Sequence, residues 1–193
     1  MQTFFRRRSD ALAANNQTAD EMIRFWRDAG AGQWFRQDLR FDQHFRTRFL
    51  GLHLAAARRE RDDWLKAPES ALALIILLDQ FPRNAFRNTA HMYATDPLAR
   101  RFARIAVTAS YMQAVEPALR LFFYLPFAHS ENLADQDLSV ALNSQLGSAE
   151  RAHAEEHRDI IRRFGRFPHR NRLLLRDTTE REQAFLEQGG FSG

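Results

Sequence analysis

"ALALIILL", residues 71–78, is the stretch that decides the fold. Eight apolar side chains follow one another without the alternation of a half-buried strand, and a helix built from them is apolar on every side. Such a helix must be buried all round, so we expect it at the centre of an all-α fold. As a helix the run spans about 12 Å, well short of the roughly 30 Å of a bilayer's hydrocarbon layer. It is therefore predicted to be a core helix rather than a membrane span.

Helical signals continue on both sides of this run. Pro68 and Pro97 suit the first turns of helices, and Gly165 suits the left-handed position after a helix end. Thr179 and Glu182 have the spacing of a capping box. We predict about eight helices, over residues 19–29, 38–59, 68–80, 96–113, 116–124, 131–146, 148–164 and 179–188. Their short connections favour antiparallel pairs, and pairs of this length suit a tetratricopeptide-like helical stack.

Composition is typical of one domain. The 193 residues are 45% hydrophobic and include 17 phenylalanines, enough for a large aromatic core. We place a single all-helical domain at residues 19–193. Residues 1–18 carry arginines with no apolar segment after them, which predicts a flexible arm rather than a secretory signal. Cysteine is absent, which excludes disulfides and thiolate metal sites and favours a cytoplasmic location.

The charge pattern argues against nucleic-acid and membrane partners. The formal net charge is +4, but 28 basic residues are offset by 24 acidic ones, and both kinds are interspersed along the predicted helices. A nucleic-acid-binding domain usually gathers its basic residues on one face. We therefore predict no nucleic acid and no membrane as partner.

Two segments of the chain end in the same way. "LDQFPRN", residues 78–84, and "HRDIIRRFGRFPHRN", residues 157–171, both run from an apolar helix into Phe-Pro, basic residues and asparagine. Proline disfavours helix before it and within it, so each Phe-Pro pair is expected to end its helix and fix the polar residues that follow. The two segments are predicted to converge in one polar cluster.

Asp79 is the residue of this cluster that most needs a partner. It is expected at the C-terminal end of the buried helix, where the helix dipole is already negative. A carboxylate buried there must be matched by a cation or become protonated. We predict that Arg83, four residues on, or an arginine from residues 166–170 contacts Asp79. The candidate ligand-binding residues are Asp79, Arg83, Asn84, His129, Arg166 and Arg170.

Three residues are candidates for acid–base chemistry, although no catalytic residue is identified. His157 continues the apolar stripe of its helix and is expected to point inward, while His169 follows the second Phe-Pro pair. In "FFYLPFAHSENLADQD", residues 122–137, Ser130 suits an N-cap and Glu131 suits the first turn of the next helix. A helix start flanked by His129 could bind an anion. The alternative, that all these groups only form ion pairs and helix caps, stays open at this point.

Two short motifs carry little weight. "HAEEH", residues 153–157, matches a zinc-protease pattern, but five residues are a weak match and supply no third ligand. "HRD", residues 157–159, has neither the asparagine nor the Gly-rich loop of a protein kinase. We predict no metal site and no cofactor.

The segments quoted above resemble a known family. "LALIILLDQFPRNAFRNTA", "YLPFAHSENLADQD" and "HRDIIRRFGRFPHRN" together are similar to the bacterial domain of unknown function 924, over about residues 22–190. The resemblance implies an all-helical, tetratricopeptide-like fold and no established activity. His157, Arg166 and His169 match the family's recurring motif, whereas His153 does not, and Arg27 departs from its aromatic-rich first block.

Two functions from different classes fit the sequence. The first, which we favour at this stage, is a binding or scaffold module that presents a concave helical surface to a peptide or protein partner. The second is a small-ligand receptor or enzyme for an anionic carboxylate or phosphate substrate. Its pocket would gather Asp79, Arg83, His129, Glu131, His157, Arg166 and His169. One cavity lined by these side chains would favour the second function, and closed ion pairs would favour the first.

Overall fold

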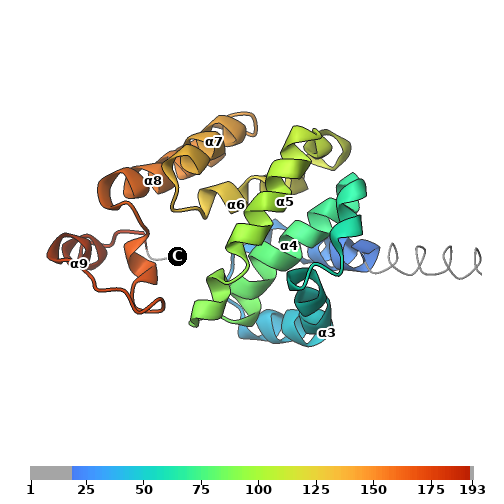
Figure 1. Ribbon diagram of the computed structural model, residues 1–193, viewed down its shortest axis with the longest axis horizontal. Helices are drawn as coiled ribbons and strands as arrows, with labels where there is room; N and C mark the ends of the chain where they lie inside the picture. The colour runs from blue at the N-terminus through green and yellow to red at the C-terminus, as the bar shows by residue number, and fades with distance from the viewer. Residues whose placement is uncertain (1–18, 192–193) are drawn as a thin grey trace, which may run out of the picture.

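The computed structural model describes residues 19–191, and within that range it contains helices and no strand (Figure 1). Residues 19–29 are helical. The further α-helices are α2 (Ala31–Trp34), α3 (Leu39–Ala57), α4 (Pro68–Ala85), α5 (Asp96–Thr108), α6 (Leu125–Ala128), α7 (Leu133–Asn143), α8 (Ser148–Phe164) and α9 (Glu180–Glu187). Short 3-10 helices connect them: η1 (Asp62–Lys66), η2 (Ala90–Tyr93), η3 (Tyr111–Ala114), η4 (Pro117–Phe123) and η5 (Pro168–Arg170). The all-α prediction is confirmed for the described chain, and the predicted arm at residues 1–18 lies outside it.

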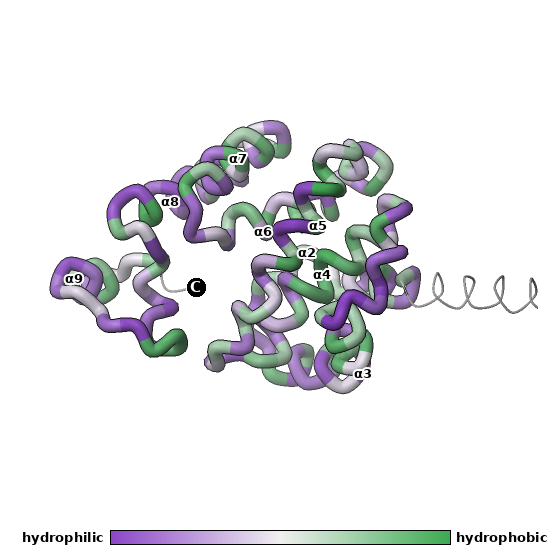
Figure 2. The backbone as a smooth tube through the Cα atoms, viewed as in Figure 1, coloured by the Kyte–Doolittle hydropathy of each residue, from purple (hydrophilic) through white to green (hydrophobic). Residues whose placement is uncertain are grey.

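Helix α4 is the centre of the fold, as its apolar run predicts. Every residue from 71 to 78 is fully buried. Helices α3 and α5 pack along α4, and η1, η2 and η4 also contact it. Figure 2 shows a hydrophobic stretch of α4 inside the molecule, whereas α8 is largely hydrophilic. The burial of so many large side chains around one helix makes this part the main core.

A second, smaller layer contains α7, α8 and α9. Helices α7 and α8 pack along each other and are joined by only four residues, 144–147, so they form an antiparallel pair. Ile160 and Ile161 of α8 form a small core with Phe167, and Phe164 and Phe185 pack against it. This layer lies apart from α3 and α4, with α5 and α6 between them in the view of Figure 1.

The predicted end of the central helix at residue 80 is wrong. Helix α4 continues to Ala85, and Pro82 lies inside it. Because proline has no N–H, the carbonyl of Leu78 loses its usual helical donor. The Thr95 hydroxyl replaces it and donates to that carbonyl over 2.5 Å. Asp79 therefore sits within the last two turns of α4 rather than at its end.

The second Phe-Pro segment follows the prediction. Helix α8 ends at Phe164, and Gly165 has the left-handed φ of 71°. Pro168 then opens η5, which carries His169 and Arg170. The capping box of Thr179 and Glu182 is also present at the start of α9.

Three other predicted boundaries are wrong. Helix α5 stops at Thr108 instead of residue 113, and Ser110 has a left-handed φ of 58° just after it. The predicted helix 116–124 is the 3-10 helix η4 followed by the short α6. The N-cap of α7 is Asn132, whose side chain accepts from two backbone N–H groups, so the helix starts at Leu133. Ser130, the predicted cap, instead donates to Asp135.

No helix within residues 19–191 is both long and apolar enough to cross a membrane.

Candidate functional site

A cavity of about 600 Å³ lies between the two layers. One part of its wall is apolar and includes Trp34, Met92, Leu121, Leu125 and Phe191. The other part is polar and includes Gln80, Arg83, His129, His157, His169 and Arg170. The main core contributes Trp34, Leu121, Leu125 and α4, while α8, η5 and Phe191 close the opposite side. The cavity is therefore built by segments that are far apart in sequence.

Asp79 is buried directly behind the polar wall, with 1% of its side chain exposed. Its Oδ1 lies 2.7 Å from His129 Nδ1, and its Oδ2 accepts from Gln80 Nε2 over 2.6 Å. Arg83 Nη1 lies 3.5 Å from Oδ1. Burial alone would raise the pKa of Asp79, but Arg83, His129 and Gln80 lower it below its usual value. The prediction that Arg83 contacts Asp79 is confirmed, and the carboxylate is ionised.

Arg83 joins this carboxylate to a second one. Its two Nη atoms donate to the two oxygens of Asp96, over 2.8 and 3.0 Å, in a bidentate pair. Its Nη1 also donates to the Asp79 carbonyl over 2.7 Å. Asp96 belongs to the first turn of α5, where the positive end of the helix dipole favours a carboxylate. Arg83 thus contacts both carboxylates and links α4 to α5.

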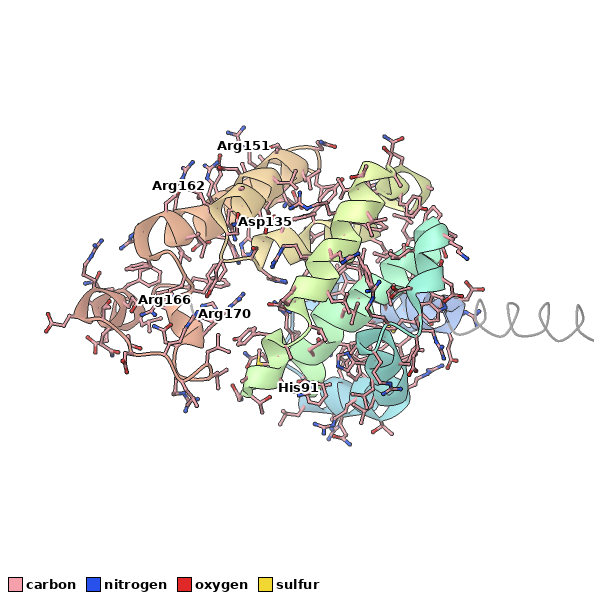
Figure 3. The ribbon with its side chains drawn as sticks, viewed as in Figure 1. His91, Asp135, Arg151, Arg162, Arg166 and Arg170 are labelled. Atoms are coloured by element: carbon pink, nitrogen blue, oxygen red, sulfur yellow. The ribbon has the colours of Figure 1, made fainter. Side chains whose placement is uncertain are left out.

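Arg170 reaches the same place from the other layer (Figure 3). Its guanidinium carbon lies 4.6 Å from the Tyr93 ring centre and 4.5 Å from that of Phe167, so the group is held between two aromatic faces. Only 8% of its side chain is exposed. Its contact with Asp96 is long, 3.8 Å, and its Nε has no hydrogen-bond acceptor within residues 19–191. Burial and the nearby Arg83 lower the pKa of Arg170.

The two Phe-Pro segments therefore converge, as predicted. The meeting point is Asp96, which contacts Arg83 of the first segment and Arg170 of the second. Tyr93 also lies against both guanidinium groups. In the sequence, residues 93 and 96 stand before and at a helix start, with no sign that they bridge two distant segments.

His157 is buried and His169 is half-buried, and both are uncharged at neutral pH. Burial lowers the pKa of His157 to about 4, and burial together with Arg170 lowers that of His169 to about 3. His157 Nδ1 lies 2.9 Å from the His153 carbonyl, so this nitrogen carries the proton and Nε2 is an acceptor. Both rings pack edge-on against Phe191, at 4.5 and 5.2 Å between ring centres. His157 points inward, as its position on the apolar stripe predicts.

Two sequence candidates lie away from the cavity. Glu131 precedes α7 instead of belonging to its first turn, and it pairs with both Nη atoms of Arg176 and accepts from the Phe167 N–H over 2.8 Å. Arg166 pairs with Glu182 at 2.6 and 2.8 Å, and Figure 3 shows it beside α9. The ion pairs of Glu131 and Arg166 both hold the segment that follows α8 in place. Asn84 lines the cavity, but its amide donates to Asp42 over 2.8 Å.

The polar cluster contains no metal site that the geometry supports. Within the described residues, no group of three or more His, Asp or Glu side chains could hold a metal ion. His153 of "HAEEH" has 60% of its side chain exposed.

The sequence matches a known protein family. The model for "Bacterial protein of unknown function (DUF924)" matches residues 22–190. The chain belongs to the DUF924 family. A solved DUF924-like structure, "Structure of Protein of Unknown Function ATU0120 from Agrobacterium tumefaciens", is 57% identical, with a TM-score of 0.88. The match covers 90% of this DUF924 chain and 99% of that one. No curated protein matches the sequence.

Proposed function

We propose that this protein binds a small organic anion with an apolar part in the cavity between its two layers. The observation that carries the proposal is Arg170, a guanidinium on the cavity wall whose contact with the Asp96 carboxylate is long, 3.8 Å. A buried charged donor without a close acceptor is costly, and evolution usually provides a partner for it. A carboxylate or phosphate supplies two acceptor oxygens in the geometry that arginine prefers.

The neighbouring imidazoles restrict the ligand further. His157 and His129 each point a hydrogen-bonded Nδ1 away from the cavity, which leaves Nε2 as an acceptor on the neutral ring. A ligand that satisfies them carries a hydroxyl or amine next to its anionic group. The opposite wall, with Trp34, Met92 and Leu125, suits a hydrocarbon or aromatic group. The volume of about 600 Å³ lies within the usual range of small-molecule sites, about 300–1,000 Å³.

A scaffold that binds a peptide on a tetratricopeptide-like stack is the second candidate. It is favoured by the helix pairs α3–α4 and α7–α8 and by exposed apolar side chains such as Phe35, with 60% exposed, and Leu175, with 94% exposed. Phe35 and Leu175 belong to segments that are far apart in the sequence. The cavity instead gathers Arg83, His129, His157, His169 and Arg170 in its lining, so we prefer the small-ligand function.

Isothermal titration with three matched compounds tests the proposal. 3-Phenyllactate has a carboxylate, a neighbouring hydroxyl and an aromatic tail; 3-phenylpropionate lacks the hydroxyl, and 3-phenylpropanol lacks the charge. We expect affinity to fall in that order. Arg170→Gln should weaken 3-phenyllactate binding by about 10-fold or more, since a hydrogen bond to a charged group contributes about 1.5–3 kcal/mol.

Arg166→Gln is the matched control, because it removes an arginine of the same segment that does not line the cavity. It should lower thermal stability and leave the affinity unchanged. Equal binding by wild type and Arg170→Gln, or no saturable binding of either acid, would show the proposal to be wrong.

A further inference from the structure

His129 stands between a buried carboxylate and the cavity. It is the residue that ends α6, and its ring lines the cavity while its Nδ1 lies 2.7 Å from Asp79 Oδ1. An ionised carboxylate only accepts hydrogen bonds, so the proton of the neutral imidazole is on Nδ1. The lone pair is then on Nε2, at the edge of the ring turned away from Asp79.

Asp79 is itself held in a fixed orientation, and it therefore fixes the orientation of the His129 ring. The carboxylate is fixed by Gln80 through Oδ2 and by Arg83 near Oδ1, and both of these residues belong to α4. Arg83 is in turn fixed by Asp96. A carboxylate oriented in this way sets the tautomer of the imidazole and stabilises the cation that forms when the imidazole takes a proton. This is the arrangement of a general base with its orienting acid.

The ionisation states agree with that role. Burial and Arg83 lower the pKa of His129, while Asp79 acts in the opposite direction. The ring is therefore neutral and able to accept a proton at neutral pH. The titratable and charged groups around His129 are Asp79 and Arg83 on α4, Asp96 on α5, His157 on α8, and His169 and Arg170 on η5.

The residues that line the cavity limit the kinds of reaction that a general base at His129 can catalyse. Its described lining contains no Ser, Thr or Cys side chain, so no hydroxyl or thiol nucleophile is available for a covalent intermediate. Tyr93 lines the cavity, and burial raises the pKa of its hydroxyl, which makes it a proton donor rather than a nucleophile. A water molecule activated by His129 can serve as the nucleophile in their place.

We propose that His129, positioned by Asp79, is the general base of a hydrolase that acts on a carboxylic ester of the small anion bound at Arg170. The inference rests on the proposed function, because Arg170 holds the substrate by its anionic group. His129 Nε2 removes a proton from water as the water oxygen bonds to the ester carbon, and the carbonyl electron pair moves to its oxygen. As that pair returns, the ester C–O bond breaks, and the leaving alkoxide takes the proton from His129. One water is consumed, and a carboxylic acid and an alcohol are formed.

Two chromogenic esters test this reaction on the full chain. Mono-4-nitrophenyl glutarate carries a carboxylate for Arg170, and 4-nitrophenyl butyrate is a neutral ester of similar length. We expect the wild type to hydrolyse the anionic ester with the higher kcat/KM. His129→Gln should lower kcat by about 100-fold or more, the usual contribution of a general base, and should still bind 3-phenylpropionate, which has no hydroxyl for His129 to accept from.

Asp79→Asn separates positioning from simple structural support. The amide can donate to Nδ1 and thereby favour the wrong tautomer, so kcat should fall and its pH profile should change, while a fold defect alone would leave the profile unchanged. His44→Gln, which removes an imidazole on α3 that does not line the cavity, controls for hydrolysis by surface histidines and should keep the wild-type rate.

The outcomes distinguish this inference from the proposed function. If 3-phenyllactate binds but neither ester is hydrolysed faster than by the His129→Gln variant, the general-base role is wrong and the ligand site stands. If the esters are hydrolysed with no preference for the anionic one and 3-phenyllactate does not bind, the substrate class is wrong. Should His129→Gln fail to fold, an unchanged pH profile in Asp79→Asn would by itself overturn the inference.

Discussion

At the scale of single residues, two imidazoles of the cavity make the folding stability depend on pH. His157 has a pKa of about 4 in the folded chain, against about 6.5 when unfolded. Between these values the unfolded chain binds the extra proton, so folding stability falls as the pH is lowered from about 6.5 towards about 4. The same sign holds for His169, whose folded pKa is about 3.

We therefore expect the free energy of unfolding to be lower at about pH 4.5 than at pH 7, with His157 alone accounting for about 2 kcal/mol. In His157→Gln this contribution is absent, and the difference between the two pH values should shrink by that amount. Urea unfolding at both pH values measures it. Identical pH dependence in wild type and variant would mean that His157 is not buried as described.

At the scale of elements, the last turns of α4 are stabilised by a side chain that lies outside the helix. Thr95 donates to the carbonyl of Leu78 that Pro82 leaves without a helical partner. Thr95→Val should cost about 1–3 kcal/mol, because the carbonyl then stays buried and unpaired. In a Pro82→Ala background the alanine N–H can reach Leu78, so the cost of Thr95→Val should be smaller. A double-mutant cycle on unfolding free energies reads this coupling, and strict additivity would contradict it.

The middle of α4 is the simplest place to test the core. Leu77 is fully buried in the middle of α4. Leu77→Ala should lower the free energy of unfolding by about 2–5 kcal/mol, the usual cost of such a cavity. A loss under about 0.5 kcal/mol would be too small for a central helix.

The behaviour of the two Phe-Pro segments shows how far local sequence determines an element. The end of α8 is predictable because Gly165 supplies the left-handed residue within the segment itself. The continuation of α4 through Pro82 is not predictable in this way, because its donor, Thr95, is 13 residues further along the chain. A helix boundary can be predicted when its cap is local and missed when the cap comes from tertiary structure.

At the scale of the whole molecule, Glu131 holds the segment after α8 against the rest of the second layer. It accepts from Arg176 and from the Phe167 N–H, on either side of η5. Glu131→Ala should leave the core of α3, α4 and α5 intact and speed amide exchange in residues 165–176. Hydrogen–deuterium exchange measures both regions at once. Faster exchange throughout the chain, or none in that segment, would contradict this role of Glu131.

The packing of the whole molecule also determines which residues line the cavity. Arg166 and Arg170 belong to the same short stretch and look equivalent in the sequence, yet only Arg170 lies on the cavity wall. The polar cluster around Asp79 could be predicted from a buried carboxylate that needs a cation. Which arginine faces the ligand depends on how η5 packs against Tyr93, and no local pattern encodes that contact.

Trp34 gives the cavity an optical signal of its own. Its ring lines the wall and lies nearly parallel to that of Trp26, 6.3 Å away between ring centres at an interplanar angle of 10°. Two indoles at that distance couple their electronic transitions, and a molecule seated against one of them changes its polarity and its quenching. Occupancy of the cavity can therefore be followed by intrinsic fluorescence and circular dichroism of the unlabelled protein, with Trp34→Phe as the silent reference.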